Sequence, residues 1–144
     1  MSSVQNRNSK RVAVIGAGAA GLCAAKHLLA QHHEVVIFEM GSHIGGLWVY
    51  QNDNGISPAY RSLHLNSEAK VTAYKDFPFP EGTPLYPDHW QVHQYLKDYA
   101  AKFGLQSHIR FNSPVVQLEP TDNGWSVTVQ GQVAQQFDAV VIGT

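Results

Sequence analysis

The sequence predicts an α/β domain built on a parallel β-sheet, and three observations support this prediction. A first strand is predicted over residues 11–16, which is apolar at consecutive positions after Arg11, as expected of a strand buried on both faces. A helix with one apolar face is predicted over residues 18–31. A second apolar strand follows over residues 34–39. A strand, a helix and another strand in this order are typical of a parallel βαβ unit.

The composition is that of one globular domain. At 144 residues the chain is long enough to bury about two-thirds of its unfolded surface. Its net charge of −1 and charged fraction of 15% give no indication of nucleic acid or an anionic membrane as a partner. Cys23 is the only cysteine, which excludes an internal disulfide and a CxxC redox pair. We therefore expect a protein of a reducing compartment, the cytoplasm.

The N-terminus superficially resembles a secretory signal, because Arg7, Lys10 and Arg11 precede an apolar run over residues 12–25. The glycines within that run and the second strand behind it favour a folded domain instead. No run approaches the roughly 18 apolar residues of a membrane span. We expect a flexible arm over residues 1–10 and one domain over residues 11–144.

The remaining elements follow from local patterns. Residues 40–87 are rich in glycine and proline and predict a long excursion with little regular structure. A helix is predicted from Asp88, as N-cap, to a stop at Gly104. A short strand is expected over 109–112, and a hairpin over 115–118 and 125–129, joined by EPTDNG. The last strand, buried on both faces, is predicted to begin at Phe137.

The glycines after the first strand have the spacing of a dinucleotide-binding loop. Gly16, Gly18 and Gly21 form G-x-G-x-x-G between a strand and a helix. The first glycine permits the tight turn, the second lets backbone approach a pyrophosphate, and the third lets the helix pack closely. The start of the helix then offers N–H groups and partial positive charge to the phosphates.

Glu39 ends the second strand, where it can accept hydrogen bonds from a ribose diol. A carboxylate there disfavours a 2′-phosphate and so argues against NADP in this site. Gly45 and Gly46 follow closely and allow backbone to run beside a cofactor. Such a pair is expected in two-dinucleotide flavoproteins rather than NAD-type dehydrogenases, so FAD is favoured.

These motifs resemble the N-terminal part of flavin-containing monooxygenases, the class that includes dimethylaniline, trimethylamine and Baeyer–Villiger enzymes. VAVIGAGAAGLCAAKHL and VVIFEMGSHIGGLW are similar to that family's FAD fingerprint. YRSLHLNSEAKVTAYKDFPFP, over residues 60–80, resembles its Y-x-S-L-x-x-N…DFPFP segment. The resemblance spans residues 10–144 and implies a Rossmann-like FAD/NAD(P)-binding half-domain, a parallel sheet with a small antiparallel hairpin or meander.

The resemblance also implies a chemistry. In that family NADPH reduces FAD, the reduced flavin takes up O₂ as a peroxide adduct, and the adduct oxygenates a nitrogen or sulfur nucleophile or a ketone. FAD and a small-molecule substrate are thus the expected partners. By their match to the family's positions, the residues expected to bind FAD are Gly16, Gly18, Ala19, Ala20, Gly21, Glu39, Gly45, Gly46, Leu47, Trp48 and, through its backbone at the adenine, Val115.

Asn66 matches the family asparagine that lies beside the flavin ring, where its amide can hydrogen-bond the oxygenated flavin. It is the one candidate catalytic residue, and a loop amide that caps a turn is the alternative interpretation. In this family the last strand leads into an NADPH-binding domain. The chain stops at Thr144, so we expect a truncated FAD-binding domain that lacks the NADPH site and full turnover. Apolar surface left uncovered would favour self-association.

Several other residues invite functional interpretations that we do not favour. His89 and His93 have i, i+4 spacing but no evident third ligand, so surface histidines are expected and no metal site. The aromatic residues Trp90, Tyr95, Tyr99 and Phe103 are expected to form a core stripe, and DFPFP to position the Asn66 loop. The alternatives for the whole protein are another flavoprotein class, amine-oxidase-like or disulfide-reductase-like, and an inactive nucleotide-binding remnant.

Overall fold

The computed structural model describes residues 9–144. Most of the predicted N-terminal arm lies outside this range. Its last two residues are tied to the turn after the first helix, because the Ser9 hydroxyl donates to the His32 carbonyl and the Lys10 amide donates to His33 Nδ1.

The parallel sheet has the strand order β3-β2-β1-β7. Its strands are β1 (Arg11–Ile15), β2 (Glu34–Phe38), β3 (Ile109–Arg110) and β7 (Ala139–Ile142). α1 (Ala19–Ala30) connects β1 to β2, as the sequence predicts. In register, Val14 lies between Ile37 of β2 and Val141 of β7. β1 is therefore central, and its carboxyl end leads directly into the glycine loop.

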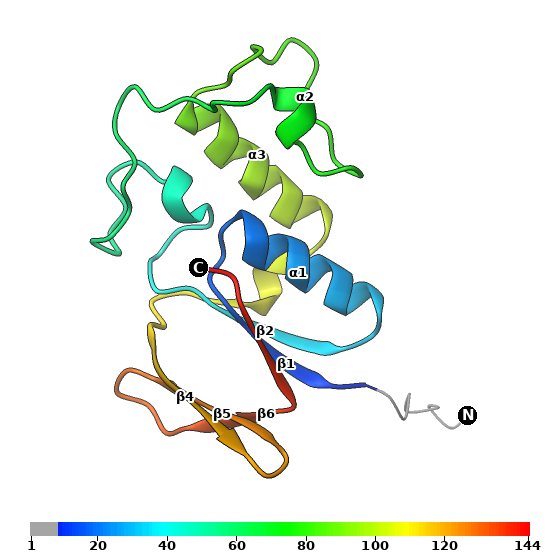
Figure 1. The fold of residues 1–144 in the computed structure, drawn as a ribbon, viewed down its shortest axis with the longest axis vertical. Helices are drawn as coiled ribbons and strands as arrows, with labels where there is room; N and C mark the ends of the chain where they lie inside the picture. Colours follow the sequence, from blue (N-terminus) through cyan, green and yellow to red (C-terminus); the bar gives the residue numbers. More distant parts are fainter. Residues whose placement is uncertain (1–8) are drawn as a thin grey trace.

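The two faces of this sheet are covered differently (Figure 1). α1 and α3 (His89–Lys102) pack on one face, where Val14, Ile37 and Leu96 belong to the larger apolar core. The antiparallel sheet β4-β5-β6 packs on the other face, where Ala13, Phe38 and other residues form a second core. Successive strand residues point to opposite faces, so one sheet supplies both cores.

The antiparallel sheet is formed by β4 (Val115–Thr121), β5 (Gly124–Val129) and β6 (Gln135–Phe137). The segment EPTDNG, predicted to join the two strands of the hairpin, is itself mostly strand, because Glu119 and Pro120 pair with Ser126 and Trp125. Only Asp122 and Asn123 form the turn.

The prediction of one last strand starting at Phe137 is wrong. Phe137 ends β6, which pairs with β5, whereas β7 starts at Ala139 and pairs with β1. The chain changes sheets at Asp138, whose amide and carboxylate bond the backbone of Arg11. β7 is an edge strand and is not buried on both faces; Ile142 is 68% exposed.

α3 begins as predicted. Asp88 and Gln91 form a capping box, in which the Asp88 carboxylate accepts from the Gln91 amide and the Gln91 side chain accepts from the Asp88 amide. Gly104 follows the helix with a left-handed φ of 66°. Tyr95 and Tyr99 are core residues as predicted, but Trp90 is half-exposed and so is not part of the stripe.

The excursion between β2 and α3 contains the 3₁₀ turn η1 (Gly46–Trp48) and the short helix α2 (Ala69–Thr72), and η2 (Leu105–His108) follows α3. The DFPFP segment packs on the helices: Phe77 and Phe79 lie against Tyr95, and Asp76 forms an ion pair with Lys26. Within residues 9–144, no helix is both long and apolar enough to cross a membrane.

Candidate cofactor-binding site

A cavity of about 460 Å³ lies where the carboxyl ends of β1, β2 and β7 meet the start of α1. In open α/β sheets this edge is the usual place for a ligand. Ten of the eleven predicted FAD-binding residues line the cavity: Gly16, Gly18, Ala19, Ala20, Glu39, Gly45, Gly46, Leu47, Trp48 and Val115.

Gly21, the remaining residue, lies behind the glycine loop rather than in the cavity lining. A Cβ at this position would overlap the carbonyl oxygen of Gly16. Gly16 itself has a φ of +100° and donates its amide to the Phe38 carbonyl over 2.8 Å. Gly21 therefore acts by letting α1 pack against the loop, as expected for the third glycine of the motif.

The start of α1 is available to an anion. Gly18 is the N-cap residue, no side chain caps this helix, and its first turn contains no acidic residue. The first intrahelical bond runs from the Leu22 amide to the Gly18 carbonyl, which leaves the preceding amides without helical acceptors. Since Ala19 and Ala20 line the cavity, a diphosphate there would meet unobstructed N–H groups.

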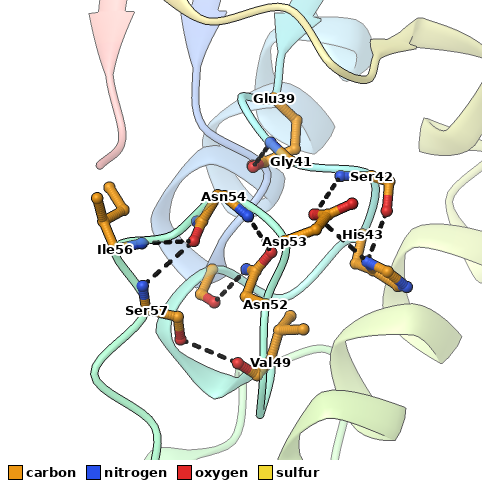
Figure 2. A network of polar contacts seen from close by, with 11 residues as sticks. Glu39, Gly41, Ser42, His43, Val49, Asn52, Asp53, Asn54, Ile56 and Ser57 are labelled. Carbon is orange, nitrogen blue, oxygen red and sulfur yellow. Dashed lines mark hydrogen bonds and ion pairs between the residues drawn. The ribbon is translucent and has the colours of Figure 1, made fainter.

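Glu39 is buried directly after β2 and is held by two backbone amides, of which the Gly41 amide is drawn in Figure 2. Its Oε2 accepts from the Ala17 amide and its Oε1 accepts from the Gly41 amide, each over 2.8 Å. A carboxylate has about four acceptor sites, so each oxygen retains one for a further donor. The arrangement fits a ribose diol, which brings two hydroxyl donors.

Gly45 and Gly46 bring a second backbone segment against the glycine loop. The Gly45 amide donates to the Ala17 carbonyl over 3.0 Å, and a Cβ on Gly46 would lie 3.0 Å from the Gly18 Cα. Both glycines have left-handed φ values, +131° and +56°. The cavity is thus bordered by backbone without side chains at two places, which fits close contact with a nucleotide diphosphate.

The prediction that both histidines of α3 lie at the surface is wrong for His89, which is buried, and holds only in part for His93, which is half-buried. His89 is fully buried, and its Nε2 bonds the Arg61 carbonyl over 3.2 Å. The His93 ring lies behind Gly45, where an added Cβ would be 2.7 Å from its Cδ2. Burial, together with the nearby Lys97, lowers the pKa of His93. The aromatic and apolar surroundings of this helix start, Tyr50 and Trp90 among them, explain why His89 is buried.

The structure adds cavity residues that were not predicted: Ile15, Phe38, Met40, Asn54, Ile56, Ser57, Pro58, Ser113, Gly143 and Thr144. Met40 adjoins Glu39 and Ser113 is close to Val115, so proximity to predicted residues could have indicated both. Asn54 and its neighbours had only a turn signal, Asn-Asp-Asn-Gly. Their place beside the Glu39 segment depends on side-chain hydrogen bonds to backbone, such as that between Asp53 and the Ser42 amide.

Asn66 is not brought to the cavity lining. It is exposed in the loop before α2. Two hydrogen bonds fix this loop to the residues just before α3: the Leu65 amide donates to the Pro87 carbonyl, and the Ala69 amide donates to the Leu85 carbonyl. Among residues 9–144, no three His, Cys, Asp or Glu side chains gather as they would around a metal ion.

Comparisons with known proteins point to the same class of flavoprotein as the sequence motifs. The model of the family described as flavin-binding monooxygenase-like matches residues 9–144. Flavin-containing monooxygenase FMO GS-OX5 of Arabidopsis thaliana is 40% identical over 160 aligned residues, covering 94% of this chain and 35% of that protein. The solved structure of S-allyl-L-cysteine S-oxygenase from Allium sativum matches with a TM-score of 0.84 and 34% identity, covering 93% of this chain and 36% of that chain.

An oxidized steroid monooxygenase bound to NADP is a more distant structural match. Its TM-score is 0.77 at 26% identity, with 93% of this chain and 26% of that chain covered. The chain spans about a third of the length of the curated relatives it matches. A family match over residues 9–144 favours this class over the amine-oxidase and disulfide-reductase alternatives. The chain belongs to the flavin-binding monooxygenase-like family.

Proposed function

We propose that this chain forms the FAD-binding part of a monooxygenase. The cofactor's diphosphate lies at the start of α1, and its adenosine ribose is bound by Glu39. The observation that carries the proposal is the buried Glu39 carboxylate, positioned by the amides of Ala17 and Gly41 at the same cavity as the uncapped helix start. The carboxylate matches the ribose diol of a dinucleotide, and the free amides match its diphosphate.

The other cavity residues bind and enclose the cofactor in this proposal. Gly18 and the Gly45–Gly46 pair allow the backbone to approach the diphosphate from two sides. The backbone of Val115 borders the adenine, with buried Ser113 beside it. Leu47 and Trp48 contribute apolar surface that excludes water. When bound, FAD supplies electron transfer and oxygen chemistry that amino-acid side chains lack.

For the whole protein we propose NADPH-dependent oxygenation of a soft nitrogen or sulfur nucleophile or a ketone. The support is the relatives: one is named as an S-oxygenase of S-allyl-L-cysteine, and another is a steroid monooxygenase bound to NADP. Asn66 is our candidate for the residue beside the flavin ring. It lies outside the cavity lining, so it would meet FAD where the ring extends beyond this cavity.

Substitution of Glu39 by glutamine tests the binding proposal. Glu39→Gln removes one acceptor and places an amide donor against backbone N–H groups, so both the ribose contacts and the Ala17 and Gly41 amides are affected. Hydrogen bonds to charged groups contribute about 1.5–3 kcal/mol, so we expect FAD affinity to fall at least about tenfold. Titration of the purified chain with FAD, followed by flavin fluorescence, measures the dissociation constant.

Glu34→Gln is the matched control. Glu34 begins β2, at the end of the strand opposite to Glu39, where it is exposed and pairs with Arg11 at 3.0 Å. This variant should bind FAD as the wild-type chain does, and thermal melting of both variants checks that they fold. Equal FAD affinity in the wild-type chain and Glu39→Gln would reject the proposed role of Glu39.

A further inference from the structure

Residues 52–58 form a wall of the cavity that no glycine motif marks. Asn54, Ile56, Ser57 and Pro58 all line the cavity, although they contribute to no helix or strand. The turn is shaped from within, because Asn54 Oδ1 accepts from the amides of Ile56 at 3.0 Å and Ser57 at 3.2 Å. The polar contacts of this wall are drawn in Figure 2.

The wall is fastened to the segment that carries Glu39. Asp53 Oδ1 accepts from the Ser42 amide over 3.0 Å and lies 3.8 Å from His43 Nδ1. Gly41, whose amide holds Glu39, permits the close approach: a Cβ there would lie 2.9 Å from both Asn52 Oδ1 and Asp53 Oδ1. Gly41 thus has two contacts: its amide holds the Glu39 carboxylate, and its Cα packs against Asn52 and Asp53 of the wall.

The wall is also joined to the Gly45–Gly46 segment. Asn52 Nδ2 donates to the Gly46 carbonyl over 3.4 Å, while Asn52 Oδ1 accepts from the Asn54 amide. The Ser57 hydroxyl donates to the Val49 carbonyl over 2.9 Å. The Asn52 and Ser57 bonds fix the two ends of the wall to Gly46 and Val49, whereas the Asp53 contact fixes its N-terminal end to residues 42–43.

We propose that Asp53 is a positioning residue for the cofactor cavity: it holds the wall, residues 52–58, against the Glu39 segment, so that both close on the same nucleotide. This role rests on the proposed function above. The hydroxyl and amide of Ser42 lower the pKa of Asp53, because hydrogen bonds from these donors favour the carboxylate form. Asp53 is half-exposed and does not line the cavity, so its effect on a bound cofactor is indirect.

Two substitutions of Asp53 test the role. Asp53→Ala removes the acceptor of the Ser42 amide, whereas Asp53→Asn retains an Oδ1 acceptor for it, loses the charge and replaces Oδ2 by an amide donor. In the purified full chain without cofactor, we expect Asp53→Ala to speed amide hydrogen exchange at Ser42, Ile56 and Ser57. FAD affinity should fall about fivefold, as loss of one hydrogen bond predicts, and Asp53→Asn should restore it to within about twofold of wild type.

Asp122→Ala is the control, because Asp122 is an exposed turn residue of the β4–β5 hairpin, away from this cavity. Gly41→Ala is a second variant, which displaces the Asn52 and Asp53 side chains from the opposite side and should also weaken FAD binding. If wild-type chain binds FAD but Asp53→Ala binds equally well, the positioning role is refuted and the proposed function stands. If the wild-type chain binds no FAD, both are refuted.

Discussion

Three glycines meet where β1, α1 and β7 come together, and their lack of side chains determines the geometry of the site. A Cβ on Gly21 would overlap the Gly16 carbonyl oxygen, and a Cβ on Gly143 would lie 2.8 Å from the Gly21 nitrogen. Backbone therefore touches backbone at this point. The contact sets the position of the start of α1, and with it the amides offered to a diphosphate.

Gly21→Ala tests this contact. The substitution has two opposite effects on the free energy of unfolding. Within a helix, alanine is favoured over glycine by about 0.5–1 kcal/mol. Overpacking against the Gly16 carbonyl costs about 1–3 kcal/mol and should outweigh that gain. We expect a net loss of roughly 1 kcal/mol in the free energy of unfolding, measured by urea denaturation.

Gly131→Ala isolates the cost of a left-handed backbone, since Gly131 has a φ of +74° and no atom within 4 Å of an added Cβ. It should cost about 1 kcal/mol without affecting the site. An increase in stability for Gly21→Ala would show that the helix and the loop are not in the contact described.

At the scale of elements, α3 anchors an excursion that has little regular structure of its own. Tyr95 is central to this: its hydroxyl accepts from the Tyr74 amide over 2.8 Å and donates to the Phe77 carbonyl over 2.6 Å. The Phe79 ring stacks on Tyr95 with centroids 3.9 Å apart. Burial raises the pKa of Tyr95 above its ordinary value, because the charged phenolate is poorly solvated there.

Tyr95→Phe should destabilise the fold by about 1–3 kcal/mol, because it leaves the Tyr74 amide and the Phe77 carbonyl without their partner. Faster hydrogen exchange of the Tyr74 amide would accompany the loss. Tyr86→Phe is the comparison, since Tyr86 is about half-exposed and should change stability by less than about 0.5 kcal/mol. Equal stability of Tyr95→Phe and wild type would contradict the anchoring role.

The elements were predictable to the extent that their signals are local. The Asp88 cap and Gly104 stop gave the ends of α3, and the apolar runs gave β1 and β2. The division between β6 and β7 at Asp138 was not predictable, because an apolar pattern does not reveal that a chain leaves one sheet for another. The burial of His89 was missed for a similar reason: its bond to Arg61 joins segments 28 residues apart.

At the scale of the whole molecule, a parallel sheet lies between a helical layer and an antiparallel sheet. Phe38 and Phe137 join the two sheets, with ring centroids 5.8 Å apart in an edge-to-face arrangement. The same sheet delivers Gly16 and Glu39 to one edge, so the motif residues of the cavity were predictable from their order. The wall of residues 52–58 was not, because its place depends on hydrogen bonds between the side chains of Asp53, Asn52 and Ser57 and backbone six to eleven residues away, for which the sequence has no pattern.

The central claim is that the cavity between the glycine loop and Glu39 binds FAD. The most direct test is a backbone amide NMR spectrum of the purified chain with and without saturating FAD. We predict that the largest shifts will fall on Gly16–Gly21, Glu39–Trp48 and Ser113–Val115, with smaller shifts in residues 52–58. No shifts at saturating FAD, or shifts concentrated on the β4–β5 hairpin, would contradict the claim.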